Sequence, residues 1–140
     1  MDFSITTELA ADAKRVEAFV ADEIIPLEAD PVHYDSYGNI DMAVLQSLRS
    51  KVKVAGLWAP QIPQAQGGMG YGPTGMAVLY EAMNQSIFGP VAFNCAAPDD
   101  GNMYILNKVA SQEQKARWLQ PIISGDCLLY TSDAADELRS

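Results

Sequence analysis

Few side chains in this sequence have the type and spacing that catalysis or metal binding requires. The single histidine, His33, has no second histidine or cysteine at a ligand spacing, so we expect a solvated loop residue and not a metal ligand. Glu81 and Glu113 lack a neighbouring base or charge that would tune a catalytic carboxylate. The sequence therefore predicts no catalytic residue and no metal site in this chain.

The glycine-rich stretch Gly67-Gly68-Met69-Gly70 could in principle cradle a phosphate. No predicted strand precedes it, and neither the P-loop spacing nor the dinucleotide-binding spacing of glycines is present. Tight backbone turns explain these glycines better, because glycine adopts conformations that other residues avoid. We predict no cofactor-binding residue here.

Composition excludes several classes of protein. The chain has 140 residues, of which 49% are hydrophobic, which is typical of one globular domain. The net charge of −9 argues against broad binding to nucleic acid or to anionic membranes. No apolar run approaches the roughly 18 residues of a membrane span, and no secretory signal is visible, so we expect a cytoplasmic location. Cys95 and Cys127 form no disulfide or metal pattern.

Helical periodicity dominates the first half of the chain. Residues 4–30 predict an amphipathic helix that Pro26 should kink or end. Its apolar face comprises Leu9, Ala13, Val16, Val20, Ile24 and Leu27. Residues 30–41 are expected to connect it to a second helix, capped by Asp41 and running through Val54, with Gly56 as the stop. Residues 56–73 are dense in glycine and proline and predict a structured loop.

The second half predicts further helices and no strand. Pro73 should begin a helix that ends at Gly89-Pro90, and Asp99-Asp100 should begin the next. The predicted buried positions of these two helices are Met76, Leu79, Tyr80, Met83 and Ile87, then Met103, Leu106, Val109 and Ala110. Ser111 and Gln114 form a capping box for a last helix that Pro121 should interrupt. The predicted fold is an all-α bundle of five or six helices.

Four motifs resemble the acyl-CoA dehydrogenase family. They are Gly56-Leu57-Trp58, Gly67-Gly68-Met69-Gly70, Glu81 with Ser86 through Gly89-Pro90, and ASQEQKARWLQPIISGD at 110–126. The resemblance covers residues 1–126, which are similar to the family's N-terminal all-α domain. Phe93-Asn94-Cys95 with Ala97 through Asn102 resembles the branch whose animal members are joined to a kinase-like domain.

The resemblance implies a flavoenzyme of fatty-acid β-oxidation that converts acyl-CoA to 2-enoyl-CoA. In this family a glutamate takes the α-proton, FAD takes the β-hydride, and an electron-transfer flavoprotein reoxidises the flavin. The resemblance also implies that the full-length enzyme is a homo-oligomer. The catalytic glutamate and most of the FAD site belong to parts of the family's chain that have no counterpart here. The 140-residue fragment alone is therefore expected to be inactive.

The segment after Gly89-Pro90 walls the fatty-acyl channel in the family. By position, the resemblance makes substrate-channel candidates of Ala96, Ala97, Pro98, Asp99, Gly101 and Asn102, which we call the 96–102 run. Small residues there would leave room for a long or bulky chain. The alternative is that Ala96 and Gly101 permit close helix packing and that Asp99 only caps a helix.

Residues 127–140 do not continue the family's pattern, which enters a β-domain through a Thr-Glu-Pro motif. CLLYTSDAADE at 127–137 matches one reading frame of a transposase-type sequencing adapter, so we assign 1–126 to the helical domain and 127–140 to a translated adapter outside the fold. The alternative is a natural divergent tail. A stand-alone helical module that binds an acyl chain or a partner without flavin is the second functional hypothesis.

Overall fold

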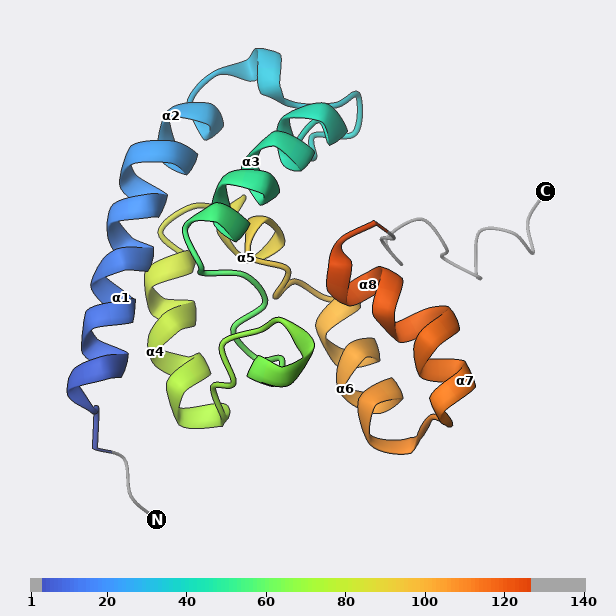
Figure 1. Cartoon of the computed structure of the whole chain (residues 1–140). Helices are drawn as coiled ribbons and strands as arrows, with labels where there is room; N and C mark the ends of the chain where they lie inside the picture. The colour runs from blue at the N-terminus through green and yellow to red at the C-terminus, as the bar shows by residue number, and fades with distance from the viewer. Residues whose placement is uncertain (1–3, 127–140) are drawn as a thin grey trace. The chain divides into compact units, whose positions relative to one another are not determined.

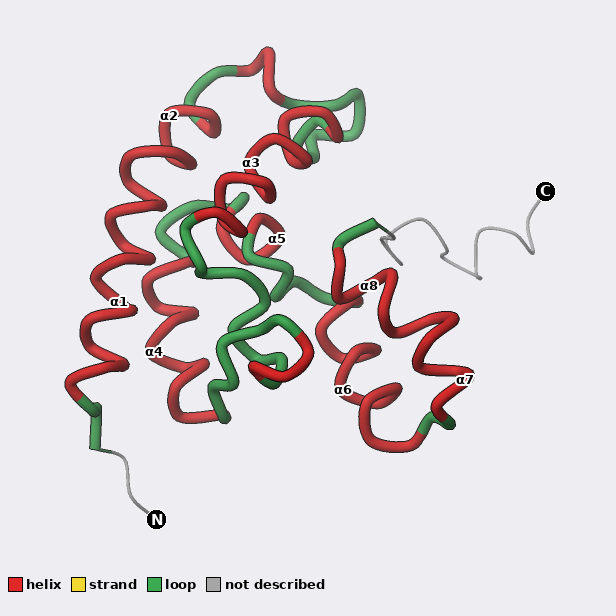
Figure 2. The backbone as a smooth tube through the Cα atoms, in the orientation of Figure 1, coloured by secondary structure: helices red, strands yellow, loops and turns green. Residues whose placement is uncertain are grey.

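The structure, a computed structural model, describes residues 4–126, and the tail assigned above to an adapter lies outside them. Helices make up the regular structure of residues 4–126, with one isolated bridge between Tyr34 and Ile40 and no strand (Figure 2). Six helical stretches are present there when α1 is counted with α2 and α7 with α8. The prediction of an all-α fold is confirmed. The chain divides into two compact units, which meet in the sequence at Cys95 and Ala96 and are described separately below.

The first unit begins with one long helical stretch. It consists of α1 (Thr7–Phe19), a π-helical turn (Val20–Ile24) and α2 (Ile25–Glu28). The predicted apolar face is buried from Leu9 to Ile24, whereas Leu27 is half-buried. Pro26 does not end the helix at once. The amide of Ile25 bonds the carbonyl of Val20, so the wider π turn lets the chain accept a proline that lacks an N–H.

The second helix of the first unit follows its sequence signals closely. A 3₁₀ turn (Pro31–His33) lies in the connector, and α3 spans Met42–Val54. Asp41 Oδ1 accepts from the amides of Ala43 and Val44 at 2.8 and 3.2 Å, as its predicted cap role requires. Gly56 has a φ of +70°, the left-handed conformation that favours glycine after a helix.

The helix that begins at Pro73 is shorter than predicted. α4 spans Pro73–Met83, and Gly89-Pro90 begins a separate short helix, α5 (Gly89–Ala92). A side chain on Gly89 would lie 1.9 Å from the carbonyl oxygen of Met83, so only glycine permits the tight turn between the two helices. Ile87 falls in this turn and is 67% exposed, which makes its predicted core position wrong.

The core of the first unit lies among its helices, with α1 packed along α4 (Figure 1). The rings of Phe19 on α1 and Phe93 after α5 meet edge to face, with centroids 5.6 Å apart. Side chains that are fully or almost fully buried include Val16, Val20, Ile24, Leu45, Leu48, Val52, Leu79, Met83 and Phe93. A second 3₁₀ turn (Gln64–Gln66) lies in the loop that joins α3 to α4.

The second unit contains α6 (Asp99–Val109) and a helical stretch made of α7 (Gln112–Gln114), a π turn (Lys115–Leu119) and α8 (Gln120–Ser124). The capping box of Ser111 and Gln114 is confirmed. Pro121 does not interrupt the helix, since a π turn precedes it as one precedes Pro26, and the helix ends at Gly125, whose φ is +78°.

The buried side of the second unit is small. Its almost completely buried apolar side chains, among the residues that the structure describes, are Met103, Leu119, Ile122 and Ile123. Leu106 and Ala110 are half-buried, and Val109 is 74% exposed, so its predicted buried position is wrong. The periodicity correctly predicts the helix α6, but this unit offers too little partner surface to cover the whole apolar face of that helix.

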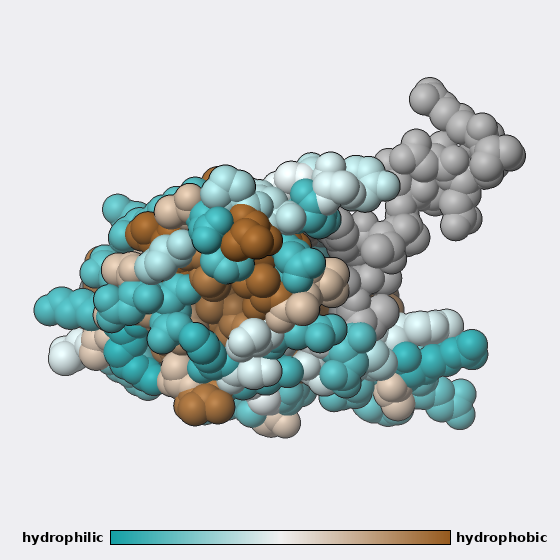
Figure 3. Space-filling model, turned by 90° about the horizontal axis from the view of Figure 1, so that it is seen from above, coloured by the Kyte–Doolittle hydropathy of each residue, from teal (hydrophilic) through white to brown (hydrophobic). Residues whose placement is uncertain are grey.

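The face of the molecule seen in Figure 3 is mostly hydrophilic. Figure 3 shows hydrophobic atoms gathered in the middle of one face, surrounded by hydrophilic residues, over the end of the first unit where α2 leads to α3. Among residues 4–126, no helix is long and apolar enough to cross a membrane.

Candidate functional site

Gly68, in the glycine-rich loop, has no room for a side chain. A side chain on Gly68 would lie 2.2 Å from the carbonyl oxygen of Ile62 and 2.4 Å from that of Ala59, so the loop closes on its own backbone. Gly67 and Gly70 have φ angles of +95° and +81°. The structure therefore supports the interpretation of these glycines as turn residues.

His33 is half-buried, and its Nδ1 lies 3.0 Å from the carbonyl oxygen of Leu27. The expectation of a solvated side chain is thus only partly met. In the part of the chain that the structure describes, no three potential ligands are grouped as a metal ion would need.

The 96–102 run lies at the start of the second unit. Ala96, Ala97 and Pro98 precede α6, and residues 99–102 form its first turn. Ala97, Pro98 and Gly101 are exposed, Ala96 and Asn102 are half-buried, and Asp99 is only 5% exposed. The Asn102 side chain donates from Nδ2 to the carbonyl oxygen of Pro98 at 3.0 Å. The six candidates therefore lie at the start of α6 and directly before it, and part of their surface is exposed.

Close packing within the second unit does not explain Gly101. No described atom of that unit lies within 4 Å of the position that a Cβ would take there. The amide of Gly101 donates to Asp100 Oδ1 at 2.6 Å, so the Asp100 carboxylate bonds an amide in the first turn of the helix. Asp99 is buried at the first helical position.

The turn just before this run is held by side chains from two distant elements. Gln61, from the loop between α3 and α4, donates from Nε2 to the carbonyl oxygen of Asn94 at 2.8 Å. Tyr80, from α4, donates to the carbonyl oxygen of Cys95 at 2.7 Å. The Cys95 thiol donates to Gln61 Oε1 at 3.1 Å, and the backbone of Ala59 donates to that of Phe93 at 3.0 Å.

Two residues in this region have left-handed backbones although neither is glycine. Ala59 has a φ of 44° and Asn94 a φ of 62°. Such conformations cost roughly 1–3 kcal/mol each and persist where surrounding contacts fix them. Phe93 through Cys95 are almost completely buried, which is consistent with a rigid turn.

Sequence reasoning did not single out Gln61, and it placed Tyr80 on an apolar helix face without a polar role. A usable signal existed for Tyr80, because a tyrosine in an apolar stripe needs a partner for its hydroxyl. No local pattern marks Gln61, since its partners lie more than thirty residues away in the sequence.

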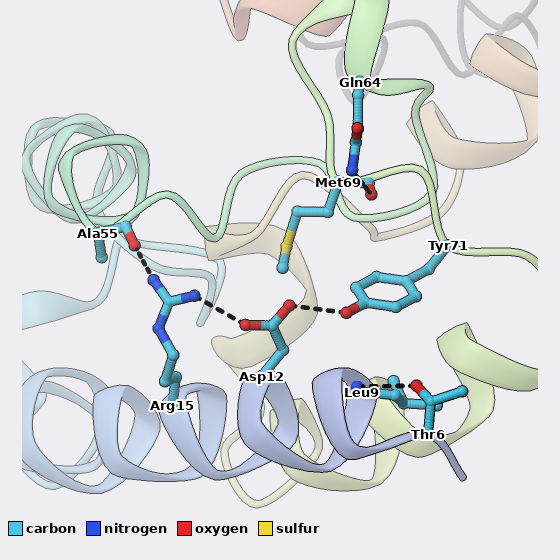
Figure 4. A network of polar contacts seen from close by, with 8 residues as sticks. All are labelled: Thr6, Leu9, Asp12, Arg15, Ala55, Gln64, Met69 and Tyr71. Atoms are coloured by element: carbon cyan, nitrogen blue, oxygen red, sulfur yellow. Dashed lines mark hydrogen bonds and ion pairs between the residues drawn. The ribbon is translucent and has the colours of Figure 1, made fainter.

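A separate polar network fixes the loop that follows α3 (Figure 4). Asp12 on α1 accepts from Arg15 Nη1 and from the Tyr71 hydroxyl, both at 2.7 Å, and Arg15 Nη2 donates to the carbonyl oxygen of Ala55 at 2.5 Å. Burial and the hydrogen bond to Asp12 raise the pKa of Tyr71 above its ordinary value. Tyr71 therefore stays protonated and acts as a structural donor, not as a base.

Comparison with known proteins identifies relatives of the chain. The sequence model described as "Acyl-CoA dehydrogenase, N-terminal domain" matches residues 6–126. The rat protein named acyl-CoA dehydrogenase family member 11 is 32% identical over 118 residues, which cover 80% of this chain and 15% of that protein. FadE2 of Mycobacterium tuberculosis, which carries an acyl-CoA dehydrogenase name, is 33% identical over 135 residues, 89% of this chain and 31% of that protein.

A solved structure from Mycobacterium abscessus, described as that of an acyl-CoA dehydrogenase, has a similar fold. The TM-score is 0.75 at 36% identity, and the match covers 88% of this chain and 33% of that one. The chain thus spans between 15% and 33% of the length of these three relatives.

Proposed function

Because the chain belongs to the acyl-CoA dehydrogenase family, we propose that it is the N-terminal helical domain of an enzyme that oxidises acyl-CoA to 2-enoyl-CoA. The observation that carries this proposal is the family match over residues 6–126, together with a fold similar to that of a relative at 36% identity. The proposed domain is residues 1–126, and the proposed origin of 127–140 is a translated adapter.

Our proposal of a flavin rests on the family match. In the glycine-rich loop, the carbonyl oxygens of Ala59 and Ile62 lie where a side chain on Gly68 would have to go. We therefore propose FAD, the electron-transfer flavoprotein and a homo-oligomer for the whole enzyme.

The part of the reaction that we assign to this chain is contact with the acyl group of the acyl-CoA substrate. The support is the exposure of Ala97, Pro98 and Gly101 at the start of α6 and directly before it, where small side chains leave space for an acyl group. Glu81 and Glu113 are both exposed, and a carboxylate open to water is poorly suited to abstract a weakly acidic α-proton. The 140-residue chain alone is accordingly proposed to be inactive.

Purification of a protein translated from the complete reading frame would test this proposal. We expect a yellow protein that reduces a ferrocenium acceptor when acyl-CoA is added, and a colourless, inactive product from the 140-residue chain. A colourless complete protein without that activity would overturn the proposal. Tight acyl-CoA binding by such a colourless protein would instead support the stand-alone acyl-binding module.

The DNA that encodes the chain gives a second test. Sequencing an untrimmed genomic clone should show that the reading frame departs from CLLYTSDAADE after codon 126. A genomic stop codon close to codon 140, preceded by those residues, would contradict both the adapter origin and the proposed longer enzyme.

A further inference from the structure

We infer that Gln61 and Tyr80 are positioning residues for the acyl-contacting run, because they hold the turn from which that run begins. The inference rests on the proposed function of the 96–102 run. It adds two residues that lie in the other unit and do not themselves have to touch the substrate.

The two side chains hold consecutive carbonyl groups. Gln61 donates to Asn94 and Tyr80 donates to Cys95, at 2.8 and 2.7 Å. Gln61 also accepts from the Cys95 thiol, so its amide engages two neighbouring residues at once. An amide with both ends occupied has one orientation, which fixes the turn more firmly than a single bond would.

These bonds lie directly before the 96–102 run in the sequence, so they can affect the conformation of its first residue. The carbonyl of Cys95 belongs to the peptide bond that leads to Ala96, and consecutive Cα atoms are about 3.8 Å apart. The amide of Cys95 is held as well, by the carbonyl oxygen of Pro90 at 2.8 Å. Both backbone groups of Cys95 are therefore held by hydrogen bonds, and the 96–102 run begins at the next residue.

The alternative is that these bonds only stabilise a buried turn. A purely structural role predicts that their loss lowers stability without changing which acyl chains are accepted. A positioning role predicts a change in acyl-chain preference, because the run starts one residue after the held carbonyl. The two roles can therefore be separated by substrate selectivity.

The first experiment compares Tyr80→Phe with Tyr34→Phe in the complete enzyme. Both substitutions remove a tyrosine hydroxyl that donates to a backbone carbonyl, at 2.7 Å to Cys95 and at 2.8 Å to Glu28. We expect Tyr80→Phe to change the ratio of kcat/KM between long and short acyl-CoA substrates about five-fold, mainly through KM, and Tyr34→Phe to leave the ratio unchanged. Gln61→Met with Gln64→Met as its control serves as a second pair, since Gln64 donates to the Met69 carbonyl in the same loop.

The second experiment does not depend on enzyme activity. In the 140-residue chain with Cys127→Ser, the rate at which Cys95 reacts with a thiol reagent reports opening of the turn. Cys95 is 2% exposed, and we expect Tyr80→Phe and Gln61→Met to speed its labelling about five-fold, whereas the two control substitutions do not.

The outcomes separate the inference from the function on which it rests. Equal labelling in the variants and their controls overturns the inference, and so does faster labelling with no change in chain-length preference. A wild-type complete protein that lacks dehydrogenase activity overturns the proposed function, and the positioning role falls with it. Faster labelling together with altered preference supports both.

Discussion

The two units of this chain differ in how far apart in the sequence their hydrogen-bonded residues lie. The first joins residues far apart in sequence: Tyr71 bonds Asp12, and Ser86 bonds Glu28, across 59 and 58 positions. In the second, Asn102 bonds Pro98 and Ser111 bonds Gln114, within four positions. Long-range contacts specify a tertiary structure, whereas short-range ones specify only a helix.

Burial shows the same contrast. The first unit buries large apolar side chains on several helices, although Val54 and Ile87 are exposed there, whereas the described part of the second buries four such side chains and leaves four exposed. Tyr104, Ile105, Val109 and Trp118 are between 46% and 74% exposed. We expect the first unit to supply most of the stability of the 140-residue chain, and the following predictions test that difference.

The largest expected effect is in the core of the first unit. Phe93→Ala should lower the free energy of unfolding by about 4 kcal/mol, because a fully buried ring is lost and a cavity remains. Val109→Ala in the second unit should cost less than about 0.5 kcal/mol, since that side chain is already exposed. Urea denaturation of both variants measures the two values, and similar losses would contradict the contrast.

Two glycines give the next comparison. Gly89→Ala should lower the free energy of unfolding by about 3 kcal/mol, because the new Cβ would clash with the backbone oxygen of Met83. A backbone atom, unlike a side chain, cannot avoid the clash by changing rotamer. Gly101→Ala should instead stabilise the second unit by about 0.5–1 kcal/mol, since a helical position with open space gains from alanine. Thermal unfolding followed by circular dichroism distinguishes the two signs. Destabilisation by Gly101→Ala would show that this glycine is needed for packing.

The polar network of the first unit should make its stability depend on alkaline pH. The folded-state pKa of Tyr71 lies above the ordinary value of 10.0. The contribution of its bond to Asp12 is therefore complete below about pH 10, and it is lost as the pH rises toward the folded-state pKa. Tyr71→Phe should cost about 1.5 kcal/mol at pH 7. The difference from wild type should shrink above pH 10, and a constant difference up to pH 11 would contradict this assignment.

Local sequence signals predicted local structure well. The caps at Asp41 and Ser111 and the stop at Gly56 are where the sequence predicts them, because each depends on a few neighbouring backbone groups. The expected interruption of the last helix at Pro121 is wrong for a physical reason. Pro26 and Pro121 each follow a π turn, and whether a helix widens to admit proline depends on its packing as well as on its sequence.

In the candidate site, too, the sequence marks residues with a local pattern and does not mark those that act through long-range contacts. The 96–102 run was found because its residues are contiguous and resemble a family pattern, and its role remains a prediction. Gln61 and Tyr80 were not found, because their partners come from another part of the chain and no local spacing reports a long-range hydrogen bond. Ile87 and Val109 fit a helical period, but burial also requires a partner surface, which neither position has in its own unit.

The smallest expected effects come from the helix caps, and they test whether the two units unfold together. Asp41→Ala and Ser111→Ala each remove a side-chain bond to a helix N-terminus, and each should cost about 1 kcal/mol. If the units unfold separately, Asp41→Ala should lower the urea-unfolding midpoint that Trp58 fluorescence reports. Ser111→Ala should then lower the midpoint that Trp118 fluorescence reports. Variants that keep only one tryptophan, with the other replaced by phenylalanine, allow fluorescence to follow each unit alone. Equal shifts of both midpoints by either substitution would show one cooperative unit, and the contrast between the two regions would then concern their contacts and not their stability.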